Sequence, residues 1–404
     1  MALTLKHDGL LRTALIPGPG AWQGYPTGAW RTDANVRDYS LPVVLALHGE
    51  ARYDPSTRAL TGGNAADFMA TSKLHDGYLV DPVRTELRCL TVYPEAAAAR
   101  FSSVTEQGGA VPFGVWNNGY WGRDHDLLST VDDVGYIAAL LTWVFDRFTA
   151  IYGDFLVKAA RGPRACAFAN SVAEDLLDAT RVYLVGHGSG AAMVYRLACE
   201  LPARLDALAP SWWTDRGGRI AGLAVVGGSR GGFRQIRDVN RLTPDADWDP
   251  TGVSGLPSNL DFLAIHGGSD ELVVPGSRVQ IANLASVRGS KEYEDTHVDV
   301  LSARAHFSLT KSLEPWAYHL GLVGSTTDHV DIMDSRNNTF VRSVVERWRY
   351  APGAYPRGNM VAFIEPRLDD QWPTGTNWST DAAGTPFGVT PTILDFFAYP
   401  ARYV

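Results

Sequence analysis

The sequence predicts an α/β protein in which a mostly parallel central sheet is covered by helices on both faces. Short, continuous apolar runs recur along the chain, as is typical of strands that are buried on both faces. Segments with helical periodicity or helix-capping residues separate many of these runs, and this alternation is characteristic of parallel sheets. The expected buried strands are 41–49 (ending in a His-Gly turn), 88–93, 181–185, 220–226 and 260–265.

Local signals predict the remaining elements. Residues 2–16 alternate in polarity and predict an opening β-hairpin. Thr130 and Asp133 have the spacing of a capping box, with Asp in place of Glu, and predict a helix start. Ser312 as a cap, followed by Pro315 in the first turn, predicts another. The expected helices are 64–74, 130–150, 190–202, 312–320 and 390–397, and the expected late strand pair is 340–350 with 360–365.

The organisation of the chain predicts one domain. With 45% hydrophobic and 20% charged residues, the composition is that of an ordinary globular protein. No internal repeat, low-complexity segment or interdomain linker interrupts it, so we expect residues 1–404 to form a single domain. Residues 1–40 supply the N-terminal hairpin and its lead-in, and about 229–258, which lack a strong period, are expected to form a surface insertion over the cleft.

Charge and hydropathy exclude several classes of partner. A net charge of −8 and a pI near 5.7 give no electrostatic attraction to nucleic acid or to an anionic membrane. No segment approaches the roughly 18 consecutive apolar residues of a membrane-spanning helix, so no membrane insertion is expected. The first residues lack the apolar region of a signal peptide, which favours a cytoplasmic or virion-associated protein over an exported one.

The cysteines predict no bridge and no metal site. Cys89, Cys166 and Cys199 lack metal-ligand spacing. Cys89 and Cys199 lie in an apolar strand and an apolar helix, so we expect them to be buried free thiols.

The stretch 181–202 contains the strongest motif. Its first five residues predict a buried strand, and from Gly190 the apolar residues recur at helical spacing until Pro202, which is expected to end the helix. Between strand and helix lies Gly-His-Gly-Ser-Gly, residues 186–190. A strand that enters a helix through a tight glycine-rich turn is the context of the nucleophile elbow of α/β-hydrolases.

The glycine spacing determines which residue stands at the nucleophile position. In G-x-S-x-G, small residues two before and two after the nucleophile let strand and helix approach closely. Gly186 and Gly190 occupy those flanks, which leaves Gly188 at the nucleophile position. Placing Ser189 there would put His187 in a flank, where its ring is too large. The sequence therefore predicts an elbow without its nucleophile.

Other segments, in matching order, are similar to one branch of the α/β-hydrolases. They are 47–49 (Leu-His-Gly), 131–134 (Val-Asp-Asp-Val), 195–202 after the elbow, 266–275 (His-Gly-Gly-Ser-Asp to Val-Val-Pro) and 368–375 (Leu-Asp-Asp-Gln-Trp-Pro-Thr-Gly). On these segments the chain resembles the polyester (polyhydroxybutyrate) depolymerase and feruloyl esterase-like enzymes over roughly residues 40–402. The resemblance implies the α/β-hydrolase fold.

The resemblance also implies the places of a catalytic triad. Asp270 matches the triad acid, Gly188 stands at the nucleophile position, and Asp370 stands where the family has its histidine, two residues before Trp372. Acyl transfer needs a hydroxyl that attacks and an imidazole that takes its proton. Both are substituted here, and two departures at independent turns favour natural loss of activity.

Further site residues follow from the same resemblance. The backbone N–H groups of Glu50 and Ser189 match the two oxyanion donors. His48 and His266 match structural His-Gly turns and are not expected to be catalytic. A Trp-Asn segment at the family's active-site mouth corresponds to an aromatic ledge for a sugar or phenolic group, with loop packing as the alternative. The expected binding residues are Trp116, Asn117, Tyr120, Trp121 and Trp372.

Two alternatives remain open at these positions. Ser189 could act as a relocated nucleophile with His329 or His187 as its base; otherwise Ser189 is a helix N-terminal capping residue, His187 a packed loop histidine and His329 a surface loop residue. Asp270 and Asp370, with the neighbouring Asp369, could attract calcium or magnesium if they lie close together. Solvated loop carboxylates are the favoured interpretation, so no metal and no cofactor are expected.

The favoured function is that of a catalytically inactive, esterase-like protein that serves as a binding or structural module. Its expected partner is a small-molecule or polysaccharide/ester ligand in the cleft, or proteins of a larger assembly such as a virion or its tail. An active carboxylic-ester hydrolase, acting on polyester, feruloyl or acetyl esters through Ser189, is the alternative. An engineered inactive enzyme would require both Gly188 and Asp370 to be artificial.

Overall fold

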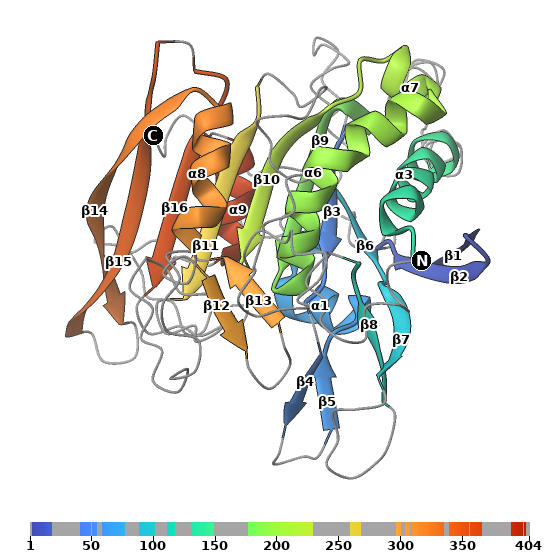
Figure 1. Cartoon of the computed structure of the whole chain (residues 1–404), viewed down its shortest axis with the longest axis horizontal. Helices are drawn as coiled ribbons and strands as arrows, with labels where there is room; N and C mark the ends of the chain where they lie inside the picture. The colour runs from blue at the N-terminus through green and yellow to red at the C-terminus, as the bar shows by residue number, and fades with distance from the viewer. Residues whose placement is uncertain are drawn as a thin grey trace, which may run out of the picture.

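The computed structural model covers the chain of 404 residues, and only part of it is described below. The described residues are 2–17, 41–49, 51–54, 59–76, 89–101, 111–117, 131–148, 177–228, 259–267, 296–299, 304–307, 309–334, 339–354, 356–365, 389–398 and 400. They include every strand of the central sheet and the helices that pack against it (Figure 1).

A ten-stranded sheet has the order β1-β2-β6-β3-β9-β10-β11-β16-β15-β14. The strands are β1 Ala2–His7, β2 Leu10–Leu15, β3 Leu41–Leu47, β6 Leu90–Pro94, β9 Leu177–His187, β10 Ile220–Val226, β11 Asp261–Gly267, β14 Leu322–Asp334, β15 Thr339–Pro352 and β16 Met360–Glu365. All neighbours from β6 to β16 pair in parallel. The β1–β2 and β14–β15 hairpins add antiparallel strands at the two edges. The chain therefore has the expected α/β-hydrolase fold class.

Three two-stranded sheets accompany the central sheet (Figure 1). They consist of β4 Ala51–Asp54 with β5 Ala59–Gly62, β7 Ala97–Phe101 with β8 Val111–Val115, and β12 Thr296–Asp299 with β13 Arg304–Phe307. Each pair is antiparallel.

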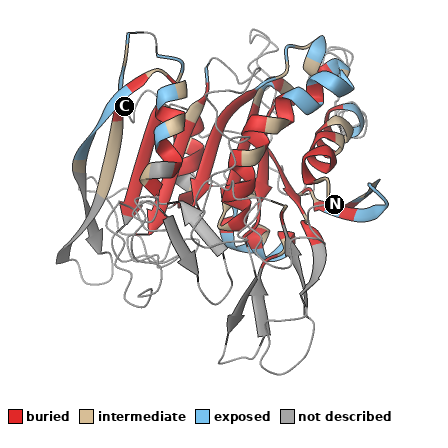
Figure 2. Cartoon of the chain, in the orientation of Figure 1, coloured by how far each residue is buried: buried red, intermediate tan, exposed pale blue. Residues whose placement is uncertain are grey.

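Helices cover both faces of the sheet. One apolar cluster contains residues of α3 Asp133–Trp143, α6 Ser189–Leu208 and α8 Leu309–His319. The cluster on the opposite face contains residues of α1 Ala65–Ser72 and α9 Val389–Ala398. Alternate residues of β3 belong to the two clusters, Val43 and Leu45 to the first and Val44 and Ala46 to the second. Strands β3, β6 and β10 are consequently buried along their whole length, as Figure 2 shows.

Short helical turns complete the described elements. They are η3 Leu74–Asp76 after α1, the π-helical turn η4 Val144–Phe148 after α3, and α7 Ser211–Thr214 after α6. None of the helices described is long and apolar enough to cross a membrane.

The end predicted for the elbow helix is wrong. Pro202 lies inside α6, which continues to Leu208. A proline in a helix removes one backbone hydrogen bond, but here the ring is buried, and Leu205 extends the apolar face beyond it. Ala209 ends the helix in the left-handed conformation, with its N–H donating to the Leu205 carbonyl at 2.8 Å.

Helices α8 and α3 begin or end at residues other than those expected. Ser312 is buried inside α8, which begins three residues earlier at Leu309, so Ser312 is not its cap. At α3 the N-cap is Asp132, whose Oδ1 accepts the Gly135 N–H at 2.8 Å. Regular α-helix ends at Trp143 rather than near residue 150.

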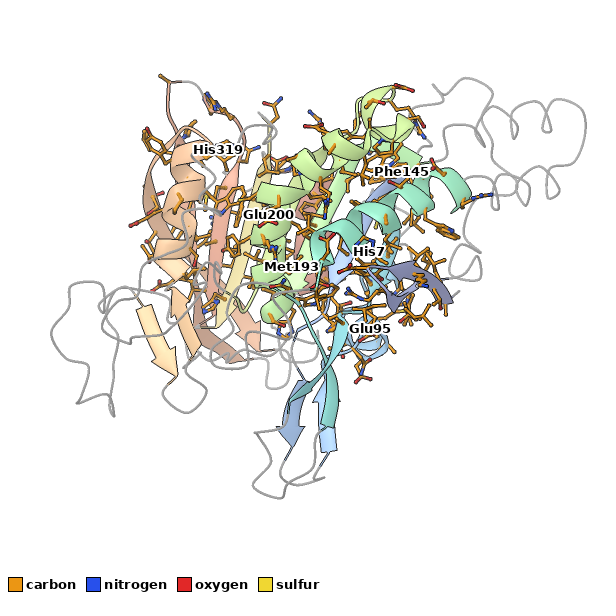
Figure 3. The ribbon with its side chains drawn as sticks, turned by 45° about the vertical axis from the view of Figure 1, so that its right-hand side comes forward. His7, Glu95, Phe145, Met193, Glu200 and His319 are labelled. Carbon is orange, nitrogen blue, oxygen red and sulfur yellow. The ribbon has the colours of Figure 1, made fainter. Side chains whose placement is uncertain are left out.

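The Asp132 carboxylate also joins α3 to two other elements. His7, which Figure 3 shows beside this helix, lies with Nε2 at 3.3 Å from Asp132 Oδ2, and Arg204 of α6 forms an ion pair with the same oxygen. The N-terminal hairpin and α6 are therefore both joined to the start of α3.

Candidate active site

Gly188 forms the turn between β9 and α6. Its φ of 52° and ψ of −118° lie in a region that residues with a Cβ rarely adopt. The turn is fixed on both sides, because the Gly188 N–H donates to the Val226 carbonyl at 2.9 Å and the Gly188 carbonyl accepts the Ala191 N–H at 3.0 Å. A sharp, strained strand-to-helix turn is the geometry of a nucleophile elbow, and here Gly188 stands at its apex.

The flanking glycines are required by close backbone approach. A Cβ on Gly186 would overlap the Gly190 carbonyl, and a Cβ on Gly190 would overlap the carbonyls of Leu47 and His48. Strand, helix and the His-Gly turn of β3 thus meet with no room for side chains at these two positions. This geometry agrees with the register in which Gly186 and Gly190 flank Gly188.

Gly188 itself has room for a side chain. A Cβ built there would lie 3.6 Å from the Gly49 Cα, an ordinary van der Waals distance. Steric crowding therefore does not require glycine at the apex. The positive φ of this residue does favour glycine. The position could hold a nucleophile sterically, but it carries no functional group.

Ser189 does not stand at the apex. It is the first residue of α6, and its side chain is only 6% exposed. Its neighbour His187 is the last residue of β9, and the imidazole stacks on Phe68 with ring centroids 6.3 Å apart and an interplanar angle of 12°. His187 is therefore a packed histidine at the end of a strand.

His48 supports the turn that follows β3. Its Nδ1 lies 2.8 Å from the Gly49 carbonyl oxygen, and its Nε2 accepts the Ala96 N–H at 3.1 Å. Because Nε2 accepts a hydrogen bond, it carries no proton. Nδ1 therefore carries the single ring proton and donates to the Gly49 carbonyl, and the ring is neutral. Burial lowers the pKa of His48 to about 4. The turn is held by a neutral histidine, consistent with the structural role expected for it.

Trp116 is a packing residue and offers no ledge to a ligand. Its side chain is fully buried, and the indole N–H donates to the His48 carbonyl at 2.9 Å. The ring lies against the His48 imidazole, with centroids 5.2 Å apart. This differs from the binding role expected for Trp116. Asn117, the next residue, is partly exposed.

A buried carboxylate, which the sequence did not reveal, holds this segment in place. Asp133 accepts the Asn117 N–H at 2.5 Å through Oδ2 and pairs with Arg12 at 2.6 Å through Oδ1. Burial raises the pKa of Asp133, whereas the Arg12 guanidinium opposes that rise. Arg196 of α6 donates to the Asn117 carbonyl from the other side. In the sequence, only the two adjacent aspartates at the start of α3, Asp132 and Asp133, could have indicated that a carboxylate holds the segment around Asn117.

The remaining expected site residues cannot be placed together. Glu50, Tyr120, Trp121, Asp270, Asp369, Asp370, Trp372 and Cys166 lie outside the described residues. His329 lies in β14, paired with Glu346 of β15, and not in the loop expected for it; its side chain is outside the description. His266 is a buried residue of β11. Of the described residues, no group of His, Cys, Asp or Glu could hold a metal ion.

The two cysteines that the structure describes are free, as expected. Cys199 is buried in α6, and Cys89 is partly buried beside β6. Burial raises the pKa of the Cys89 thiol to about 11. Burial therefore makes both of these described cysteines poor nucleophiles.

No protein-family model and no curated protein matches the sequence. Solved structures give similarities of shape at low identity. An acetyl xylan esterase from Aspergillus awamori is 12% identical, with 99% of each chain covered and a TM-score of 0.44. The native form of pOPH is 13% identical, with 100% of this chain and 90% of that chain covered and a TM-score of 0.38. Esterase 2 of Thermogutta terrifontis is 14% identical, with 68% and 74% covered and a TM-score of 0.33. Since these scores are below 0.5, conclusions about the site rest on its own geometry.

Proposed function

We propose that this chain is an esterase-like protein of α/β-hydrolase fold that does not hydrolyse esters and serves as a binding or structural module. The observation that supports this proposal is Gly188 at the apex of the elbow, with a φ of 52° and a ψ of −118°. In an esterase this backbone conformation exposes the side chain of the nucleophile, whereas Gly188 has only a hydrogen atom at that place.

The chemistry of acyl transfer explains why this substitution is decisive. The reaction begins with attack by a side-chain oxygen, whose proton passes to a histidine. Glycine has no atom that can attack. In the proposed register Asp370 replaces the histidine, and a carboxylate cannot relay a proton between Asp270 and a nucleophile in the way that imidazole does.

The proposed ligand is one that a hydrolase cleft would bind without cleaving it. It is a small molecule or a polysaccharide ester in the cleft, or a protein partner in a larger assembly such as a virion or its tail. The support for this is indirect: the elbow, its flanking glycines and the His48 turn keep the geometry of a reaction site. Binding is the role that we propose such a site can keep without a nucleophile.

Restoring both missing groups tests the proposal. Hydrolysis of 4-nitrophenyl acetate should be absent in the wild type, in Gly188→Ser and in Asp370→His, and present in the double variant Gly188→Ser/Asp370→His. The matched control is Gly188→Ala/Asp370→His, which has the same backbone strain and the same histidine but no hydroxyl. Activity in the serine double variant alone supports the register.

The alternative, an active esterase that uses Ser189, predicts a different result. The wild type would then release nitrophenol in a burst, and Ser189→Ala would abolish it, as would replacement of His329 or His187 if either is the base. That outcome would contradict the proposed loss of activity.

A further inference from the structure

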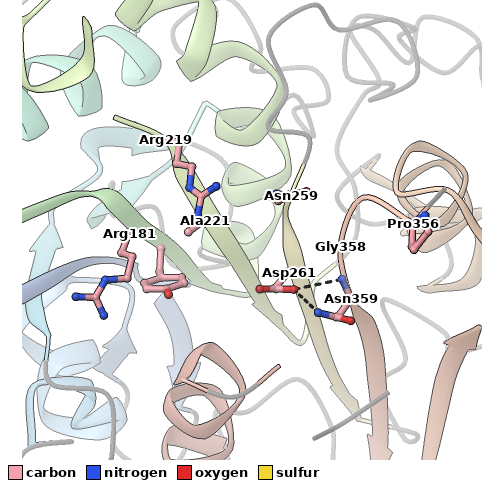
Figure 4. Close-up of a pocket in the computed structure, with 9 residues that line it drawn as sticks. Arg181, Arg219, Ala221, Asn259, Asp261, Pro356, Gly358 and Asn359 are labelled. Atoms are coloured by element: carbon pink, nitrogen blue, oxygen red, sulfur yellow. Dashed lines mark hydrogen bonds between the residues drawn. The ribbon is translucent and has the colours of Figure 1, made fainter. Parts of the chain in front are cut away.

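A polar cavity, shown in Figure 4, lies where β10 and β11 begin, and it is open to solvent, with Arg219 and Pro356 exposed. Its volume is about 420 Å³, within the size range of small-ligand sites. The lining residues come from the middle of β9, from the starts of β10 and β11 and from the turn that leads into β16. They include Arg181, Tyr183, Arg219, Asp261, Pro356 and Asn359. The elbow lies at the other end of β9, roughly 20 Å away along an extended strand. The two sites are therefore separate.

Arg219 supplies a fixed positive charge to this cavity. Its backbone N–H donates to the Ala179 carbonyl at 3.0 Å, and its side-chain Nε donates to the Thr180 carbonyl at 3.0 Å. These bonds orient the guanidinium, and within the described part of the chain its two terminal nitrogens have no hydrogen-bond partner. Arg181, in contrast, is already paired with Asp178 at 2.5 Å.

Asp261 and Asn359 supply acceptors on the other side. Asp261 Oδ1 accepts both the Asn359 backbone N–H at 3.2 Å and the Asn359 side-chain Nδ2 at 2.8 Å, as the dashed lines in Figure 4 show. Asn359 thus donates to a single carboxylate oxygen from both its backbone and its side chain. Among the described residues no hydrogen bond reaches Asp261 Oδ2 or the Asn359 side-chain carbonyl, so both can accept from a ligand. Burial raises the pKa of Asp261, whereas the Asn359 bonds lower it, so a cation beside Oδ2 would stabilise the charged form.

The strand register keeps the two opposite charges apart. Gly222 of β10 is the neighbour of Asp261 in β11, and Arg219 precedes Gly222 by about 10 Å of extended chain. Among the residues that the structure describes, no ion pair joins Arg219 to Asp261. A positive and a negative group therefore face the same cavity without direct contact, although the Arg219 charge helps to lower the pKa of Asp261.

We propose that this cavity binds a small zwitterion, a free α-amino acid, with its carboxylate on Arg219 and its ammonium group on Asp261 and the Asn359 carbonyl. Guanidinium binds carboxylate through two parallel hydrogen bonds, and an ammonium group donates to carboxylate and amide oxygens. Ala221 and Pro356 give the cavity apolar surface against which the amino-acid side chain can pack.

Three matched probes test the proposal with the wild-type chain. L-Phenylalanine should bind and raise Tm in a saturable manner. N-Acetyl-L-phenylalanine lacks the ammonium group and L-phenylalaninamide lacks the carboxylate, so each should bind at least about tenfold more weakly, the loss expected when one charged hydrogen-bonded partner is removed. Glycine and L-alanine extend the series to smaller side chains.

Variants assign the two charges to residues. Arg219→Gln and Asp261→Asn should each weaken amino-acid binding about tenfold, as measured by isothermal titration calorimetry. Arg357→Gln is the control, because Arg357 is an exposed arginine of the same turn that does not line the cavity. The proposal is overturned if none of L-phenylalanine, glycine and L-alanine binds, or if N-acetyl-L-phenylalanine binds as tightly as L-phenylalanine. It is also overturned if Arg357→Gln weakens binding as much as Arg219→Gln and Asp261→Asn.

Discussion

Gly188 and Gly49 face each other across the elbow, so that a Cβ on Gly188 would lie 3.6 Å from the Gly49 Cα. This distance allows a side chain at the apex of the turn. In the proposed register the nucleophile is therefore lost through the identity of one residue, since the turn around Gly188 is neither collapsed nor blocked. The backbone conformation that would present a serine is retained around a glycine.

Alanine substitutions should separate the roles of the glycines. Gly188→Ala should lower the free energy of unfolding by about 1–3 kcal/mol, because a Cβ at a φ of 52° is strained but meets no close atom. Gly190→Ala should cost more than about 3 kcal/mol, because its Cβ would overlap the Leu47 and His48 carbonyls and the backbone must move. Urea denaturation of both variants measures the difference. Equal losses would contradict the assigned roles.

The buried Asp133 should matter far more than its neighbour Asp132. Asp133→Asn leaves the buried Arg12 guanidinium without its counter-charge, and about 3–5 kcal/mol of stability should be lost. Asp132→Asn is a matched control: asparagine caps a helix as well as aspartate does, and the partly exposed ion pairs with His7 and Arg204 are worth roughly 0–1 kcal/mol. Comparable losses in the two variants would show that Arg12 does not depend on Asp133.

His48 should make stability fall in moderately acidic solution. Its pKa in the folded protein is about 4, below the value of about 6.5 expected in the unfolded chain. Between these values the unfolded state binds more protons, so the contribution of His48 is fully present above about pH 6.5 and is lost as the pH falls towards 4. The change is on the order of 3 kcal/mol.

The variant His48→Gln tests this assignment. It keeps a polar side chain in the same turn but does not titrate, so its stability should depend less steeply on pH between 6.5 and 4 than that of the wild type. His75→Gln is the control, because His75 is only partly buried and contacts the Tyr93 hydroxyl instead of the turn after β3. Identical slopes in wild type and His48→Gln would be the contrary result.

The sequence predicted what continuous burial and close packing determine. Strand 220–226 was predicted with both its limits, because every residue of β10 is buried. The close approach of strand and helix that the glycine spacing implied is present at Gly186 and Gly190, where a Cβ would overlap backbone atoms.

The sequence did not predict features that depend on distant partners or on exposed strands. Arg12 and Asp133 are 121 residues apart, and no local pattern connects them. The strand that contains His329 was missed because much of β14 is exposed at the sheet edge and has no apolar run. Pro202 was given too much weight as a helix terminator, since the buried face of α6 extends beyond it.

Covalent labelling by an alkyl fluorophosphonate tests the central claim most directly, because the reagent reacts with an activated serine and needs no knowledge of the natural ligand. Intact-mass spectrometry should show an unchanged wild-type mass and one adduct on the Gly188→Ser/Asp370→His variant. A stoichiometric adduct on the wild-type chain, mapped to Ser189, would contradict the account and identify a working hydrolase.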